Sequence, residues 1–105
     1  MTTEITIARI YLSEAEHRGT HKPLMQEILN VLRNQQKVLN VTVFRGIAGM
    51  ADSGEVHADD ILRLMVDLPV VIEFYDEPKV VDAVLDMLAK HIEPGRTVLW
   101  NATRR

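Results

Sequence analysis

The sequence predicts an α+β sandwich of the split βαβ, ferredoxin-like type, with a four-stranded antiparallel sheet and two helices on one face. The order of the elements is the first reason: strand-like and amphipathic helical segments follow one another as strand, helix, strand, strand, helix, strand. The length is the second. A chain of 105 residues has room for one hydrophobic core, so we expect residues 1–105 to form a single domain.

Four segments have the character of strands. Each is a short run rich in Val, Ile, Thr, Tyr or Phe and bounded by polar residues, Gly or Pro. We place them at residues 5–12, 40–48, 68–76 and 96–100. In the first strand, apolar residues occupy both alternating sets of positions. A sheet that buries both faces needs a second cover besides the helices, and another copy of the chain is the simplest one.

Two segments have helical periodicity. Residues 22–37 place Met25, Ile28, Leu29 and Leu32 on one stripe, which predicts an amphipathic helix. The second helix opens at Asp76-Glu77-Pro78, because proline suits a first helical turn. Its apolar stripe consists of Val81, Val84, Leu85, Leu88 and Ile92, and Glu93-Pro94-Gly95 is expected to end it.

The connection after the second strand is unusually long. The strand ends at Arg45-Gly46, and residues 49–67 separate it from the next strand. A hairpin needs only about two to five residues to reverse the chain, so this segment serves another purpose. We expect a short helical turn within its stretch ADDILRLMVD, capped by Asp59 or Asp60.

Composition excludes several classes of function. The chain has no cysteine, so disulfides and thiolate catalysis are ruled out, and its net charge of −3 argues against nucleic-acid binding. No signal peptide and no apolar run long enough for a membrane span is present, which predicts a cytoplasmic protein. No Walker or HExxH sequence occurs, and nothing places a nucleophile, a base and an orienting acid together, so we do not expect an enzyme. A small enzyme that acts on a nucleotide is kept as a further hypothesis.

The strand end at residues 45–49 carries the first candidate site. Gly46 and Gly49 could bring backbone N–H groups close to a phosphate, or they could form a β-bulge or a turn. Arg45 could bind a phosphate through two hydrogen bonds, or it could make a surface or inter-subunit ion pair.

The four histidines raise the alternative of a metal site. His17 and His21 are four residues apart, but Gly19 and Pro23 disfavour a continuous helix there. His57 lies in the long connection, and His91 is placed near a helix C-terminus. Scattered exposed histidines are the simpler interpretation, and His57 is the weak candidate for a metal ligand.

The sequence resembles a known family along nearly its whole length, from about residue 5 to 100. The stretches that carry the resemblance are HKPLMQEIL, VTVFRGIAGM with SGEVH beyond it, and DLPVVIEFYDEP. They are similar to the bacterial domain-of-unknown-function family 190, which is grouped with the nitrogen-regulatory PII proteins. The resemblance implies a ferredoxin-like homotrimer, and residues 50–66 would occupy the place of the mobile PII T-loop.

The resemblance also implies a ligand and its site. PII-like proteins usually hold an adenine nucleotide in each cleft between subunits, so ATP, ADP, AMP or cyclic AMP is the expected ligand. By position, the implied ligand-binding residues are Thr42, Arg45, Gly46, Gly49, Gly95, Arg96, Arg104 and Arg105. From the residues alone, Gly95-Arg96 could equally be a helix stop, and the terminal arginines a solvated tail.

Partners follow from the same resemblance. PII-type proteins often act on membrane transporters or channels, so a protein target of that kind is implied, reached through the 50–66 loop. The alternative is a CutA-like trimer that binds divalent metal or is purely structural.

Overall fold

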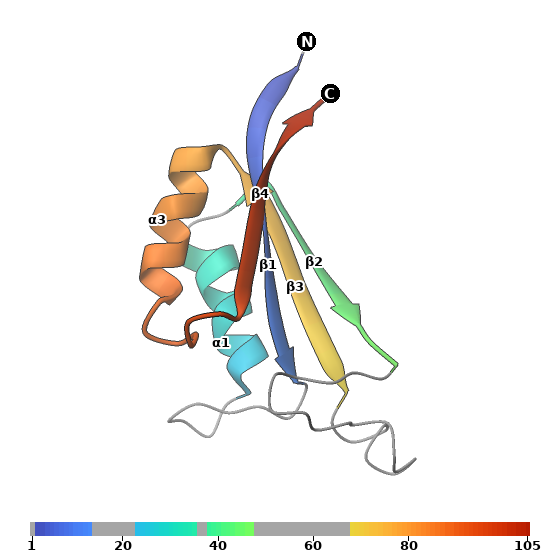
Figure 1. The fold of residues 1–105 in the computed structure, drawn as a ribbon. Coiled ribbons are helices and arrows are strands. Elements are labelled where there is room, and N and C mark those ends of the chain that lie inside the picture. The colour runs from blue at the N-terminus through green and yellow to red at the C-terminus, as the bar shows by residue number, and fades with distance from the viewer. Residues whose placement is uncertain (1, 14–22, 36–37, 48–67) are drawn as a thin grey trace.

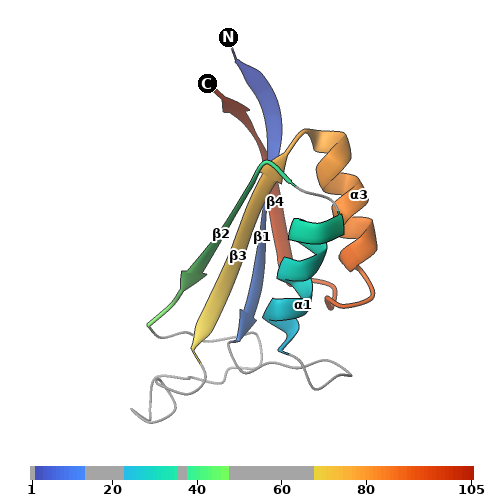
Figure 2. The same cartoon turned by 180° about the vertical axis from the view of Figure 1, so that it is seen from behind.

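The computed structural model describes residues 2–13, 23–35, 38–47 and 68–105. Its strands are β1 (Thr3–Ser13), β2 (Asn40–Arg45), β3 (Pro69–Asp76) and β4 (Thr97–Arg104). Its helices are α1 (Leu24–Asn30), which continues into a π-helix, η1 (Val31–Gln35), and α3 (Pro78–Leu88). The strands form one antiparallel sheet in the order β2-β3-β1-β4. Both helices lie on the same side of it (Figures 1 and 2). The predicted fold class is confirmed.

The alternation of side chains along the central strands places the core. In β3 every second residue is buried, and Ile72 and Phe74 have no exposed surface. Their partners across the β1 ladder, Ile10 and Ala8, are equally buried, because residues directly opposite each other share a face. The helices add Ile28, Leu32 and other aliphatic side chains to this layer. None of the helices in the described ranges is long and apolar enough to cross a membrane.

The first helix differs from its prediction over residues 22–37. It is α-helical only over Leu24–Asn30, after which the chain winds as a π-helix. Leu24, Ile28, Val31 and Leu32 are buried, whereas Leu29 and Met25 are only partly covered. Leu32 and its neighbour Val31 therefore both face the core, which the simple 3.6-residue stripe did not predict.

The second helix is shorter than predicted. It ends at Leu88, and residues 89–91 form a turn followed by a bend at Ile92, yet Ile92 still belongs to the core. The Ile92 N–H donates to the Leu88 carbonyl at 3.1 Å, which keeps one helix-like turn at this point. The predicted apolar stripe therefore extends beyond the end of the helix, because the turn after Leu88 also directs the Ile92 side chain into the core.

The last strand is longer than the predicted 96–100. It continues to Arg104, opposite Thr3, because β1 begins earlier than expected and offers a partner for these residues. The side chains of Thr6 and Asn101 also interact, with the threonine hydroxyl donating to Asn101 Oδ1 at 2.9 Å. The terminal Arg104 is therefore part of the sheet and not of a solvated tail.

Asp76 links three elements at the end of β3. It is only 8% exposed. Its Oδ2 accepts a hydrogen bond from the Leu39 N–H before β2 at 3.1 Å, and its Oδ1 accepts one from the Glu77 N–H before α3 at 2.6 Å. Both oxygens are used as acceptors, so no neutral side chain of the same shape can replace them.

We expect Asp76→Asn to destabilise the protein. The amide keeps one acceptor and turns a donor toward a backbone N–H, which costs about 1–3 kcal/mol. Urea unfolding followed by circular dichroism measures the loss. Asp82→Asn on the exposed face of α3 is the control, with an expected change within about 0.5 kcal/mol. Equal losses in the two variants would contradict the linking role of Asp76.

Candidate functional site

The side of the sheet away from the helices has no cover within the described chain. We call it the open sheet face. Its residues alternate with those of the core along each strand: Asn40, Thr42 and Phe44 of β2, Val71, Glu73 and Tyr75 of β3, Ile7, Arg9 and Tyr11 of β1, and Val98, Trp100 and Ala102 of β4. Large apolar side chains among them remain exposed, including Tyr11, Phe44, Val98 and Trp100. Such a contiguous surface is typical of an interface.

Arg9 lies in the middle of the open sheet face. Its Nε donates to Glu73 Oε1 at 2.8 Å on the neighbouring strand. Its guanidinium also lies 5.7 Å from the ring centre of Phe44 and 5.4 Å from that of Trp100. These are distances at which a cation is attracted to an aromatic ring. The hydrogen bonds to Glu73 and then to Tyr11 raise the pKa of Arg9, so its charge is permanent.

The end of β2 presents the first predicted ligand residues. Arg45 is the last residue of the strand and pairs opposite Val70, while Thr42 pairs opposite Glu73 on the open sheet face. The Thr42 hydroxyl accepts a hydrogen bond from Asn40 Nδ2 at 3.2 Å. Because β2 is an edge strand, both side chains lie where a second molecule can approach them.

Gly46 has a structural task at this strand end. Its N–H donates to the Pro69 carbonyl at 2.7 Å, so within the chain this N–H is already used. A Cβ on Gly46 would lie 2.6 Å from Cγ of Pro69, closer than side chains pack. Gly46 therefore permits the close approach of two segments. Gly49, with the rest of residues 48–67, lies outside the described residues.

The turn between α3 and β4 contains the second group, Gly95 and Arg96. Gly95 has φ of +89°, a conformation that favours glycine, and no atom lies within 4 Å of where its Cβ would be. The Arg96 guanidinium donates to the Tyr11 carbonyl at 3.2 Å, and the Arg96 carbonyl accepts from the Tyr11 N–H at 2.9 Å. This holds the turn against the end of β1.

The third group, Arg104 and Arg105, lies at the other end of the sheet. Arg104 pairs opposite Thr3, and its guanidinium is 6.0 Å from the ring centre of Tyr75. Both arginines are exposed.

The three groups cannot meet within one chain. The ends of β2 and β4 near Arg45 and Gly95 are at the same end of the sheet but on opposite edges, about 14 Å apart at three strand spacings. Arg104 is separated from both by most of the length of β1, about 30 Å. One small ligand that contacts all three groups must therefore lie between different chains.

The alternative of a metal site concerns the histidines and the carboxylates near them. Among the described residues, no three His, Asp or Glu side chains are grouped to hold an ion. His91 instead approaches Glu27, with Nδ1 at 3.6 Å from Oε2. His17, His21 and His57 lie outside the described residues.

Comparison with known proteins identifies the family. The sequence matches the DUF190 family, described as "Uncharacterized ACR, COG1993", over residues 5–104. The chain belongs to the DUF190 family. The UPF0166 protein MJ1524 of Methanocaldococcus jannaschii is similar to it, with 33% identity over 93 residues, 89% of this chain and 83% of that protein.

Solved structures share the fold of this DUF190 chain. CPII from Thiomonas intermedia K12, bound to ADP and bicarbonate, has a TM-score of 0.64 at 16% identity, covering 99% of this chain and 89% of that one. The apo form of CPII, described as a nitrogen regulatory PII-like protein, has a TM-score of 0.58 at 15% identity, covering 99% and 92%. At such identity the similarity establishes a PII-like fold and leaves the ligand to be argued separately.

Arg9 is the residue of this DUF190 chain that the sequence analysis missed. It lies between Ala8 and Ile10, in a strand whose other residues are mostly apolar. A charged residue within an apolar strand, with Glu73 inside another, was the available signal. Recognising the pair required the register between β1 and β3, which sequence alone does not supply.

We expect Gly46→Ala to destabilise the protein by about 1–3 kcal/mol, because the new methyl group meets the rigid ring of Pro69. Removing the ring in Gly46→Ala/Pro69→Ala should recover part of that loss, and a double-mutant cycle with thermal unfolding measures the coupling. The control is Gly95→Ala, which has space for the methyl group and only backbone strain. Strictly additive effects of the two substitutions at 46 and 69 would contradict the proposed contact.

Proposed function

We propose that this protein is a PII-like regulator that binds a small anionic ligand, foremost an adenine nucleotide, between the subunits of a homotrimer. The observation that carries the proposal is the placement of the cationic groups. Arg45 ends one edge strand, and Arg96 precedes the other edge strand at the same end of the sheet. A ring of chains would bring the β2 edge of one subunit beside the β4 edge of the next.

The chemistry of this end of the sheet suits a phosphate. A guanidinium binds phosphate through charge-assisted hydrogen bonds, and two such groups from neighbouring chains would hold one anion from both sides. The ADP bound by CPII, a protein of similar fold, supports a nucleotide as the first ligand to test.

In this proposal the segment after β2 transmits ligand binding to a target protein. Residues 50–66, which lie outside the described residues, follow directly from the strand end that carries Arg45. A ligand that binds one arrangement of this segment better than another would shift its population. A protein target, a membrane transporter or channel in the first instance, would read that shift.

The open sheet face supports the assembly. It combines exposed aromatic and aliphatic residues with an internally neutralised ion pair, Arg9 with Glu73. A partner that covers this surface would gain apolar contact without burying an unpaired charge. A second copy of the chain offers an equally apolar surface.

We expect isothermal titration to show saturable binding of ATP, ADP, AMP or cyclic AMP at about one ligand per chain. Arg45→Gln should lower the affinity for the preferred ligand by about 10- to 100-fold, which corresponds to the loss of a charge-assisted hydrogen bond. Arg33→Gln, an exposed arginine on the helix side, is the control and should bind normally. Absence of binding of all four nucleotides would refute the nucleotide part of the proposal.

Mixing two inactive variants tests the position of the site between chains. Arg45→Gln and Arg96→Gln subunits, unfolded together and refolded, should recover about one quarter of the binding sites if each site takes one arginine from each neighbour. If both arginines came from the same chain, the mixture would recover none.

We expect Trp100→Glu to separate the assembly into monomers, because it places a charge on the open sheet face. Leu99→Glu is the matched control. The two residues are neighbours in β4 with similar exposure, 40% and 47%, but Leu99 pairs opposite the buried Ala8 and so faces the helix side. Sedimentation velocity gives the mass of each variant. A trimer that survives Trp100→Glu would place the interface elsewhere.

A further inference from the structure

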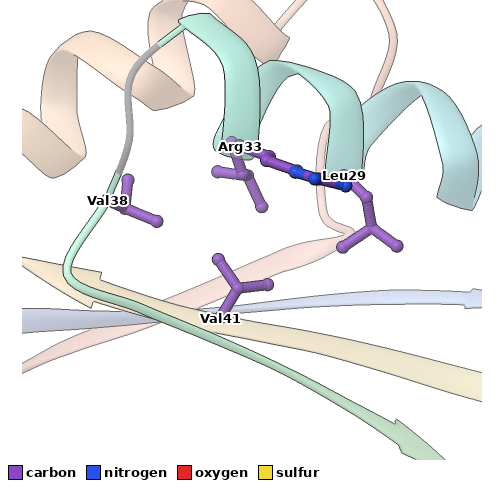
Figure 3. A pocket seen from close by; sticks show the side chains of 5 residues that line it. Leu29, Arg33, Val38 and Val41 are labelled. Carbon is purple, nitrogen blue, oxygen red and sulfur yellow. The ribbon is translucent and has the colours of Figure 1, made fainter.

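A groove lies on the helix side of the sheet, between edge strand β2 and the helix formed by α1 and η1. Its volume is about 530 Å³, and it is lined by Leu29, Leu32, Arg33, Val38 and Val41 (Figure 3). This volume falls in the range of about 300–1,000 Å³ that is typical of small-molecule sites. Four of the five lining residues are aliphatic.

The groove exists because the helical layer stops short of the edge of the sheet. Val41 and Phe74 are directly opposite each other and share the helix side. Phe74 is completely buried, whereas Val41 is 36% exposed. The helices therefore cover β3 but not β2. The apolar side chains of β2 form the base of the groove, beside the buried Leu32.

One cation borders this apolar surface. The Arg33 side chain runs back along the helix toward Leu29, so its guanidinium lies at the wall of the groove (Figure 3). In the described part of the chain, no acidic side chain forms a salt bridge with Arg33. Arg33 belongs to the π-helical segment η1, and π-helical turns occur frequently at functional sites.

We propose that this groove binds a small free monocarboxylate with an apolar body. The body would lie on Val41, Val38 and Leu32, and the carboxylate would accept hydrogen bonds from Arg33. Apolar contact removes both surfaces from water, and the guanidinium of Arg33 selects an anion over an alcohol of the same length.

The groove is separate from the proposed nucleotide site but shares a strand with it. Val41 and Arg45 both face the helix side, because their partners on β3, Phe74 and Val70, are buried in the core. They lie four residues apart, about 13 Å along β2, and Thr42 between them faces the open sheet face. A carboxylate in the groove would therefore contact β2 without occupying the place proposed for phosphate.

The test uses the full chain with labelled Leu, Val and Ile methyl groups, titrated with octanoate below its micelle concentration and with 1-octanol. We expect octanoate to shift the methyl resonances of Leu29, Leu32, Val38 and Val41 and to bind roughly tenfold more tightly than the alcohol. Arg33→Gln should lower octanoate affinity to that of octanol. The control Lys79→Gln, which removes an exposed cation on α3, should leave octanoate affinity unchanged.

Three results would overturn the proposal. Equal binding of octanoate and octanol by the wild-type protein would remove the role of Arg33. Shifts centred on the methyl groups of Val71 and Val98 would place the ligand on the open sheet face. Shifts of the groove methyl groups on raising the protein concentration, with no response to octanoate, would show that a second copy of the chain fills the groove.

Discussion

The alternation of side chains along β1 is the constraint on which the rest of the structure depends. This strand pairs with β3 on one side and β4 on the other, so its register fixes which residues of both neighbours face the helices. A shift by one residue would exchange Ile10 and Arg9 between the core and the open sheet face. The aliphatic core on one side and the charged centre of the other are thus two consequences of a single register.

The open sheet face shows how a charge can lie within an apolar surface. Arg9 is hydrogen-bonded to Glu73 and lies near the rings of Phe44 and Trp100, so its charge is balanced before any partner arrives. A pair of this kind contributes little to affinity, because its desolvation offsets its attraction. It can still select the orientation of a partner, since a wrongly placed copy would separate the pair from its aromatic neighbours.

The sequence predicted the fold class because the apolar periodicities and the order of elements were consistent. It failed where a residue's role depends on a distant strand. β4 reaches Arg104 because Thr3 is there to pair with it, and the π-helix at Val31–Gln35 has no signature in helical spacing. For the candidate site, Arg45 and Gly46 were found as the end of a strand, but sequence could not show that Pro69 already accepts the hydrogen bond from the Gly46 N–H.

The pairing of β1 with β4 also brings the two ends of the described chain together. Thr3 is opposite Arg104, and both lie at the end of the sheet away from Arg45 (Figure 1). A short turn could therefore connect them as a hairpin, which is the arrangement that tolerates circular permutation. A fluorescent fusion or surface tether attached at this end would likewise leave the β2 end of the sheet accessible, so the protein can be immobilised or tracked without obstructing the strand end that carries Arg45.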